Sequence, residues 1–320
     1  MNGLSLRVAD SIAVLSIDQP DSKVNVLSRA LWTELETALR ELARRSDLHG
    51  LILESAKPGI FIAGADLKEL GDVPGADRPS TRQFIELGLG VLEVLETLPF
   101  PTAACIDGAA LGGGLEVALA CDYRLAGMNP KTKFGLPEVT LGLIPGWGGT
   151  QRLPRIIGAT SAIELLLGDV QFDAETAGYR GLVAKVVPSE SLRAETSQLL
   201  SEAHAADSWH VGRERKQRPF EVDRTGFRME DLSEGSVSEA TFNAMSISPE
   251  ALGAFREQVE DRLAGSARLA ASLTVLDLIE RGCVLPLPEA IRLETEAFLR
   301  LAGGSDARKL IADFFASRRR

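Results

Sequence analysis

The stretch that decides the fold of this 320-residue chain is Leu111-Gly-Gly-Gly-Leu-Glu116. An apolar run before it, Pro101 to Ile106, predicts a short buried strand, and Glu116-Val-Ala-Leu-Ala-Cys121 predicts the opening of a helix. The three glycines therefore lie at a strand-to-helix turn, where a backbone without Cβ atoms lets a ligand approach closely. Because the first N–H groups of a helix lack intrahelical acceptors, we expect Gly113 to stabilise an oxygen that gains negative charge. Glu116 lies three residues further on, so it would be a base on the same helical face.

A second carboxylate and a second backbone donor come from two other glycine-containing stretches. Glu138 follows Phe134-Gly-Leu-Pro137, and the run 59–66 predicts a strand that ends in Ala65 and Asp66 before a short helix at 67–70. We expect Ala65 N–H to point into the same space as the first donor. Two carboxylates beside exposed N–H groups suit acid/base chemistry on a carbonyl compound. Taken singly, Glu116 would be a solvated partner of the helix dipole and Glu138 a surface carboxylate.

Three motifs occur in a fixed order: Ile62-Ala-Gly-Ala-Asp66, Gly108-Ala-Ala-Leu-Gly-Gly-Gly-Leu-Glu116 and Phe134-Gly-Leu-Pro-Glu-Val-Thr-Leu-Gly-Leu-Ile-Pro-Gly-Trp-Gly-Gly-Thr-Gln-Arg152. Together they resemble the enoyl-CoA hydratase/isomerase (crotonase) superfamily, from about residue 5 to about residue 190. Short strands that alternate with helices predict an α/β class. The resemblance adds a crotonase-like spiral of β-β-α turns, followed here by a C-terminal helical extension.

The resemblance implies a role for each matched residue. Ala65 and Gly113 N–H groups would bind the thioester oxygen. Glu116 and Glu138 would hold the water that adds across the α,β double bond, one as its base and the other moving the α-proton. Gly146 N–H would help to place that water. Since family members that hydrate have both glutamates, we expect a lyase that converts trans-2-enoyl-CoA to 3-hydroxyacyl-CoA in fatty-acid β-oxidation, with Δ3-Δ2 isomerase as a side activity.

The coenzyme A part of the substrate is expected beside two segments. By resemblance, the residues that line its channel or flank its adenine end are Lys23, Val24, Val26, Ala63, Asp66 and Leu67. A solvated surface lysine is the alternative for Lys23, and Asp66 also suits the N-cap of the helix at 67–70. Trp147 either lines the acyl pocket or packs against a neighbouring helix.

Several other functions lack their motifs. The sequence contains no His-Glu-x-x-His, Cys-x-x-Cys, P-loop or Gly-x-Ser-x-Gly, so we expect neither a metal site nor a serine hydrolase. Gly88-Leu-Gly-Val-Leu-Glu93 has glutamate where a dinucleotide fingerprint has its third glycine, so we expect no NAD site and no cofactor. The formal net charge of −10 argues against nucleic acid and against an anionic membrane surface as partners.

The three cysteines and the N-terminus indicate a cytoplasmic protein. Cys105, Cys121 and Cys283 lack paired spacing, so we expect buried, reduced thiols. The N-terminus leads directly into a strand-like pattern, and no apolar run reaches the roughly 18 residues of a membrane span. The sequence leaves both a monomer and an oligomer open.

Periodicity predicts most elements of the first 200 residues. We expect paired strands over 4–18, an amphipathic helix from Ser28 to Ser46, a strand at 51–53, a helix at 82–98 and another over 189–208. Ser28 is the predicted N-cap of its helix. The apolar stripe of that helix is Leu31, Leu35, Leu39 and Leu42.

The C-terminal third differs in character. We predict a crotonase-like catalytic core at 1–190, a following helix at 191–218 and a helical linker-type extension at 219–320, with an irregular arm over 212–235. The extension resembles the linker helix of the multifunctional fatty-acid oxidation protein, whose hydratase half is the most similar family member and whose dehydrogenase half is missing here. A separate 3-hydroxyacyl-CoA dehydrogenase would then oxidise the product. A thioester hydrolase and a non-catalytic docking subunit are the alternatives.

Overall fold

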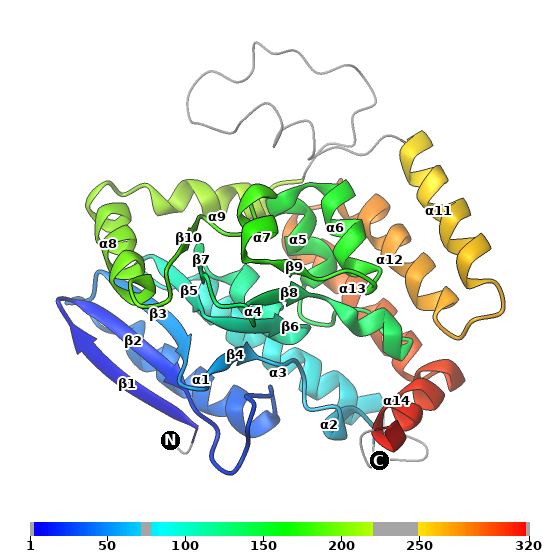
Figure 1. Cartoon of the computed structure of the whole chain (residues 1–320), viewed down its shortest axis with the longest axis horizontal. Helices are drawn as coiled ribbons and strands as arrows, with labels where there is room; N and C mark the ends of the chain where they lie inside the picture. The colour runs from blue at the N-terminus through cyan, green and yellow to red at the C-terminus, as the bar shows by residue number, and fades with distance from the viewer. Residues whose placement is uncertain (1–2, 72–77, 220–248, 318–320) are drawn as a thin grey trace. The chain divides into compact units, whose positions relative to one another are not determined.

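A computed structural model of the chain describes residues 3–71, 78–219 and 249–317 (Figure 1). Its contacts divide into two compact units. Unit 1 comprises Met1–Leu136 and Gln171–Glu214, and unit 2 comprises Pro137–Val170 and Arg215–Arg320. The chain therefore leaves unit 1 after Leu136 and returns at Gln171. The domain boundaries at 190 and 218, drawn from sequence character, stay a prediction.

Unit 1 contains a six-stranded sheet. In spatial order its strands are β1 (Leu4–Ala9), β2 (Ile12–Ile17), β3 (Gly50–Ser55), β5 (Thr102–Ile106), β7 (Tyr123–Gly127) and β10 (Lys185–Val187). β1 and β2 form an antiparallel hairpin, which confirms the paired strands predicted over 4–18. Its two turn residues, Asp10 and Ser11, both have positive φ, as tight hairpin turns require. The remaining neighbours in this sheet pair in parallel.

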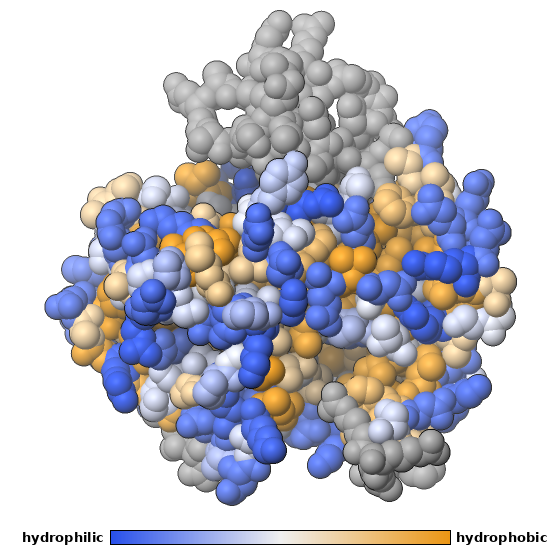
Figure 2. Space-filling model, in the orientation of Figure 1, coloured by the Kyte–Doolittle hydropathy of each residue, from blue (hydrophilic) through white to orange (hydrophobic). Residues whose placement is uncertain are grey.

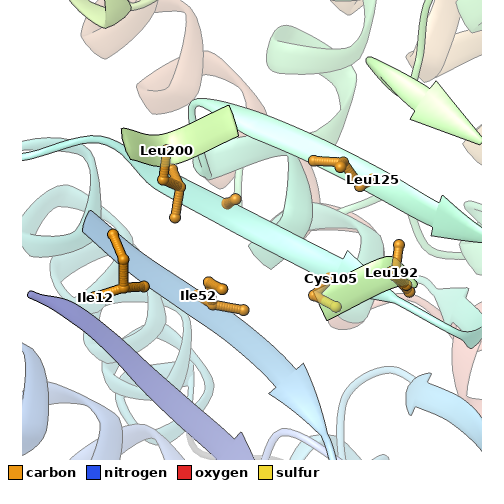
Figure 3. Close-up of a cluster of buried hydrophobic side chains, with 7 residues drawn as sticks. Ile12, Ile52, Cys105, Leu125, Leu192 and Leu200 are labelled. Carbon is orange, nitrogen blue, oxygen red and sulfur yellow. The ribbon is translucent and has the colours of Figure 1, made fainter. Parts of the chain in front are cut away.

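One face of this sheet is closed by α8 (Leu192–Ala205), which confirms the helix predicted over 189–208. Figure 3 shows the cluster of buried side chains that joins them: Ile12, Ile52, Ala103, Cys105 and Leu125 from the strands, with Leu192 and Leu200 from the helix. All five residues of β5 are buried, as expected for a parallel strand with both faces covered. These contacts stabilise the six-stranded sheet, whose strands β3 and β5 lead directly into strands of the smaller sheet described below.

The predicted helix from Ser28 is α1 (Arg29–Leu42), and it contacts α3 (Arg78–Glu96). The Ser28 hydroxyl accepts a hydrogen bond from Leu31 N at 3.2 Å, which confirms the N-cap. The four predicted stripe residues are all buried. The helix ends at Leu42, four residues earlier than predicted, because the chain turns over residues 43–47 before β3. Gly88 and Gly90 lie within α3, so that stretch is a helix and not a phosphate-binding turn.

A smaller sheet in unit 1 completes the spiral. Its strands, in order, are β4 (Gly59–Ile62), β6 (Gly108–Leu111), β8 (Lys133–Gly135) and β9 (Phe172–Asp173). Each turn runs through one strand of each sheet and then a helical segment: β3, β4 and α2 (Lys68–Gly71), then β5, β6 and α4 (Gly113–Ala120). The predicted crotonase-like spiral is therefore the observed fold. The sequence does not predict strand β6, because Gly108–Leu111 contains no β-branched or aromatic residue.

Unit 2 is helical. Its elements are η1, a 3-10 helix (Pro137–Leu141), α5 (Gly149–Ile157), α6 (Ala159–Leu166), α11 (Pro249–Leu263), α12 (Leu269–Gly282), α13 (Leu287–Ala302) and α14 (Ser305–Ser317). The predicted helical extension is confirmed by the last four helices. It packs on α5 through α12 and α13, and on η1 through α14. The part of the third motif that forms η1 and the start of α5 therefore packs against the helices of the extension.

The prediction that an irregular arm begins at Gly212 is wrong. Helix α9 (Trp209–Gln217) continues past Gly212, and residues 220–235 of that arm lie outside the described residues. Arg213 explains the helix: its guanidinium donates to Asp122 at 2.6 and 2.8 Å and to the carbonyls of Leu98 and Phe100. These bonds anchor α9 to unit 1.

Hydrophilic residues are spread over the face of the molecule drawn in Figure 2, with small hydrophobic patches between them. Among the helices that the structure describes, none combines the length and apolar character needed to cross a bilayer. The three cysteines are buried and unpaired, as predicted.

Candidate active site

The two predicted backbone donors leave the same edge of the small sheet in unit 1. Parallel strands β4 and β6 pair Ile62 with Ala110. Ala65 and Gly113 each lie three residues beyond that pair, so the two segments leave the sheet side by side. The start of α4 packs tightly here, because a Cβ on Gly114 would lie 2.3 Å from the carbonyl oxygen of Ile62. Only glycine allows this approach.

Both donors have their N–H groups unengaged. Leu27 N donates to Gly64 O at 2.8 Å and Asp66 N donates to Leu27 O at 3.0 Å, so this bridge uses the groups on either side of Ala65. The N–H of Ala65 points the other way. Gly113 is the first residue of α4, where no intrahelical acceptor exists. Among the described residues, neither of these two N–H groups has an acceptor.

Glu116 lies one turn into α4, on the same face as Gly113. Its side chain is buried, with 1% of the residue exposed, so the alternative of a solvated partner of the helix dipole is wrong. A carboxylate in the first turn of a helix is stabilised by the helix dipole. Unit 1 therefore combines two unengaged donors with a buried carboxyl group nearby along the chain.

Glu138 belongs to unit 2 and lies in η1. The residue is half-buried, but its Oε2 atom is buried and has no hydrogen-bond partner among the described residues. Burial raises the pKa of this carboxyl to about 8; a backbone hydrogen bond within Glu138 lowers it, and the charge of Glu294 raises it further. A carboxyl group that keeps its proton near neutral pH can act as a general acid. The alternative of a solvated surface carboxylate is wrong.

Glu294 of α13 is a functional candidate that the sequence analysis did not single out. Its residue is 0% exposed, and its carboxylate accepts from Gly148 N at 2.6 Å, Thr150 N at 2.8 Å and Thr150 Oγ1 at 2.5 Å. Burial raises the pKa of Glu294 to about 7, against the lowering effect of these hydrogen bonds and of Arg152. The available signal was a glutamate on the buried face of a predicted helix, between Ala290 and Phe298.

Gly146 and Trp147 lie just before α5 in unit 2, and both are buried. The N–H of Gly146 has no acceptor among the described residues, and the carbonyl of Trp147 accepts from Arg152 Nη1 at 2.6 Å. Only 2% of Trp147 is exposed. A role of this side chain in the acyl pocket stays a prediction.

The two predicted coenzyme segments lie next to each other in unit 1. Ala63 N donates to Asn25 O at 2.8 Å, and the bridge between Leu27 and Ala65 continues this pairing. The predicted residues that share these neighbouring segments are Lys23, Val24, Val26, Ala63, Asp66 and Leu67. Lys23 is exposed, so both of its alternatives stay open. Asp66 Oδ1 accepts from Lys68 N, the first residue of α2, at 3.1 Å, so this carboxylate pairs with the start of that helix.

Asn25, which the sequence analysis missed, holds these segments in place. Its side chain is 0% exposed. The Nδ2 group donates to Ile17 O, Ser55 Oγ and Phe61 O, and Oδ1 accepts from Gln19 N. A polar residue between Val24 and Val26 was the available signal.

A cavity of about 600 Å³ in unit 1 is lined by none of the predicted site residues. It lies beside Cys105 and the Glu54–Arg193 ion pair, whose closest atoms are 2.6 Å apart. Burial raises the pKa of the Cys105 thiol to about 12, so this thiol is not a nucleophile near neutral pH. This cavity is therefore separate from the predicted site, whose place at the edge with Ala65 and Gly113 stays a prediction.

The spiral of β-β-α turns, with backbone donors after β4 and β6, defines a crotonase-like protein. A model of the family described as enoyl-CoA hydratase/isomerase matches residues 7–262, so this chain belongs to that family. The family resemblance stated from the three motifs is confirmed.

Solved structures support the same family. The chain is similar to Pseudomonas aeruginosa DspI, with 33% identity over 67% of this chain and 84% of that chain and a TM-score of 0.60. An enoyl-CoA hydratase from Bacillus anthracis is 27% identical, with 99% of this chain and 97% of that chain covered and a TM-score of 0.59. An enoyl-CoA hydratase from Geobacillus kaustophilus is 25% identical over 99% and 95%, with a TM-score of 0.59. The last two matches include the helical extension.

Proposed function

We propose that this chain hydrates trans-2-enoyl-CoA thioesters to 3-hydroxyacyl-CoA. The observation that carries the proposal is the pair of unengaged N–H groups, Ala65 and Gly113, at one sheet edge with the buried Glu116 one turn away. Glu138 is the proposed second acid/base group, because its raised pKa keeps it protonated near neutral pH. Family membership favours a CoA thioester as the substrate.

In the proposed mechanism, the thioester oxygen accepts hydrogen bonds from Ala65 and Gly113. Ionised Glu116 takes a proton from water while the water oxygen bonds to C3, and the π electrons move onto the thioester oxygen as an enolate. Protonated Glu138 then delivers a proton to C2, and one water has been added overall once the proton taken by Glu116 returns to Glu138. Loss of one such oxyanion donor typically costs about 10²–10³ in rate. The N–H of Gly146 would orient the attacking water.

The same two carboxyl groups support Δ3-Δ2 isomerisation as a side activity, because a carboxyl with a pKa near 8 can both give and take a proton at carbon. In this proposal coenzyme A is part of the substrate, and Lys23 and its neighbouring segments bind it. We also propose that a separate dehydrogenase oxidises the 3-hydroxyacyl thioester product, as part of fatty-acid β-oxidation in the cytoplasm.

The decisive measurement follows the loss of the conjugated enoyl thioester absorbance over a series of acyl lengths. Glu116→Gln and Glu138→Gln should each lower kcat by about 10²–10⁴ while the thioester still binds. Glu289→Gln, which removes an exposed carboxylate on α13, is the matched control and should keep full activity.

A thiol-reactive dye in the same assay detects free coenzyme A and identifies a thioester hydrolase. No turnover of any enoyl-CoA would favour a docking subunit. Repeating the length series with Trp147→Ala should shift the preferred acyl length if that side chain lines the pocket; an unchanged profile would assign it to packing.

A further inference from the structure

Unit 2 holds two buried carboxyl groups with opposite hydrogen-bond environments. Glu294 accepts three hydrogen bonds from Gly148 and Thr150 at the start of α5, whereas Glu138 Oε2 has no partner among the described residues. The charge of Glu294 raises the pKa of Glu138, which couples the two groups. Hydrogen bonds to a carboxylate favour its ionised form. When the pair holds one proton, that proton therefore resides on Glu138.

We propose that Glu294 is a positioning residue for Glu138: it fixes the turn at Gly148–Thr150 and, as the ionised member of the pair, keeps the proton on Glu138. The donation of this proton to substrate rests on the proposed function. The coupling between the two carboxyl groups does not. It links the helical extension to the acid of the site through a residue on α13.

One further charged group acts in the same sense. Arg152 of α5 lowers the pKa of Glu294, which favours the ionised form of that member. Helices α6 and α14 also pack on η1. Their charged residues are Glu164, Asp306, Arg308, Lys309 and Asp313, none of which is a cause of the Glu138 shift. Burial is the largest cause of that shift, so loss of the Glu294 charge should lower the pKa of Glu138 without restoring its ordinary value.

The test is Glu294→Gln, which keeps the side-chain shape and one acceptor but removes the charge. Protonation of Glu138 is followed by the infrared carbonyl band of the protonated carboxyl against pH, assigned by its loss in Glu138→Gln. We expect Glu138 to lose its proton about half a pH unit or more lower in Glu294→Gln. The alkaline limb of kcat/KM for hydration should move by the same amount, whereas an unchanged Glu138 titration would overturn the proposal.

Glu289→Gln on the same helix is the control: an equal shift in this variant would also overturn it, since the effect would not be specific to Glu294. The reciprocal experiment serves if Glu294→Gln does not fold. In Glu138→Gln the titration of Glu294 should move to lower pH, because coupling between two sites is mutual. No movement there refutes the coupling. A shifted titration without turnover of any enoyl-CoA would refute the proposed function and support the coupling.

Discussion

Three buried carboxyl groups, those of Glu116, Glu138 and Glu294, differ in the hydrogen-bond donors that surround them. Glu116 lies at the N-terminal end of a helix, Glu294 faces three donors, and the buried oxygen of Glu138 has none among the described residues. The sequence singled out Glu116 and Glu138 as candidates because each follows a glycine-rich motif. It did not predict the role of Glu294, since Gly148 and Thr150 are more than 140 residues away along the chain.

The raised pKa of Glu138 predicts a pH-dependent stability. Because the folded-state pKa of about 8 exceeds the ordinary 4.5, the native state binds more protons than the unfolded state between these values. The free energy of unfolding should therefore fall as pH rises from about 4.5 to about 8. Glu138→Gln removes this loss, so at pH 8 the free energy of unfolding of the variant should exceed that of the wild type by on the order of 1–3 kcal/mol.

Urea unfolding at pH 5 and pH 8 measures this difference. At pH 5 the two proteins should nearly coincide. A gain of equal size at both pH values would show that the stabilisation does not come from ionisation of Glu138.

At the scale of elements, amphipathic helices were predictable and short strands of small residues were not. The leucine stripe and the serine cap specify α1 locally. Strand β6 contains only glycine, alanine and leucine, without the β-branched or aromatic residues that signal a strand. Its existence depends on pairing with β4 and β8, which are distant in sequence. The helix α9 was likewise hidden, because Arg213 stabilises it through Asp122.

The tight packing of α4 on β4 predicts that alanine substitutions at Gly114 and at Gly90 change the free energy of unfolding in opposite directions. Gly114→Ala would place a Cβ 2.3 Å from the Ile62 carbonyl oxygen, so we expect a loss of about 1–3 kcal/mol in the free energy of unfolding. Gly90→Ala in α3 meets no atom within 4 Å and should stabilise by about 0.5–1 kcal/mol through helix propensity.

Chemical denaturation of both variants checks this, with hydration activity as a second readout. Only Gly114→Ala should also lower kcat, because it displaces the Gly113 donor. Equal stability of the two variants would contradict the tight packing of α4 on β4.

At the scale of the whole molecule, the predicted site residues are divided between the two units. The donors, Glu116 and the coenzyme segments lie in unit 1, and Glu138, Gly146 and Trp147 lie in unit 2. The spiral itself came from the resemblance of three motifs, since periodicity alone specifies strands and helices but not their winding. The grouping of residues 137–170 with the C-terminal helices could not be predicted, because contacts between distant parts of the chain have no local sequence pattern.

Net charge gives a prediction at the same scale. The formal charge of −10 opposes an anionic coenzyme, so a basic residue beside its channel must offset this field locally. If Lys23 binds coenzyme A, Lys23→Gln should raise KM about 2–5-fold at low salt, with kcat unchanged. The difference should shrink as added salt screens the charges.

Initial rates at several ionic strengths provide the measurement. Lys309→Gln on α14, which also removes an exposed lysine, is a control for loss of a surface cation. An identical KM in the wild type and in Lys23→Gln would favour the solvated surface lysine.

The crossing of the chain between units has a consequence for synthesis on the ribosome. Glu138 leaves the exit tunnel long before α13, which supplies Glu294. A nascent chain that has completed both sheets still lacks the buried neighbour of its acid. The order of translation therefore delays formation of the Glu138–Glu294 pair until nearly the last helices have been made.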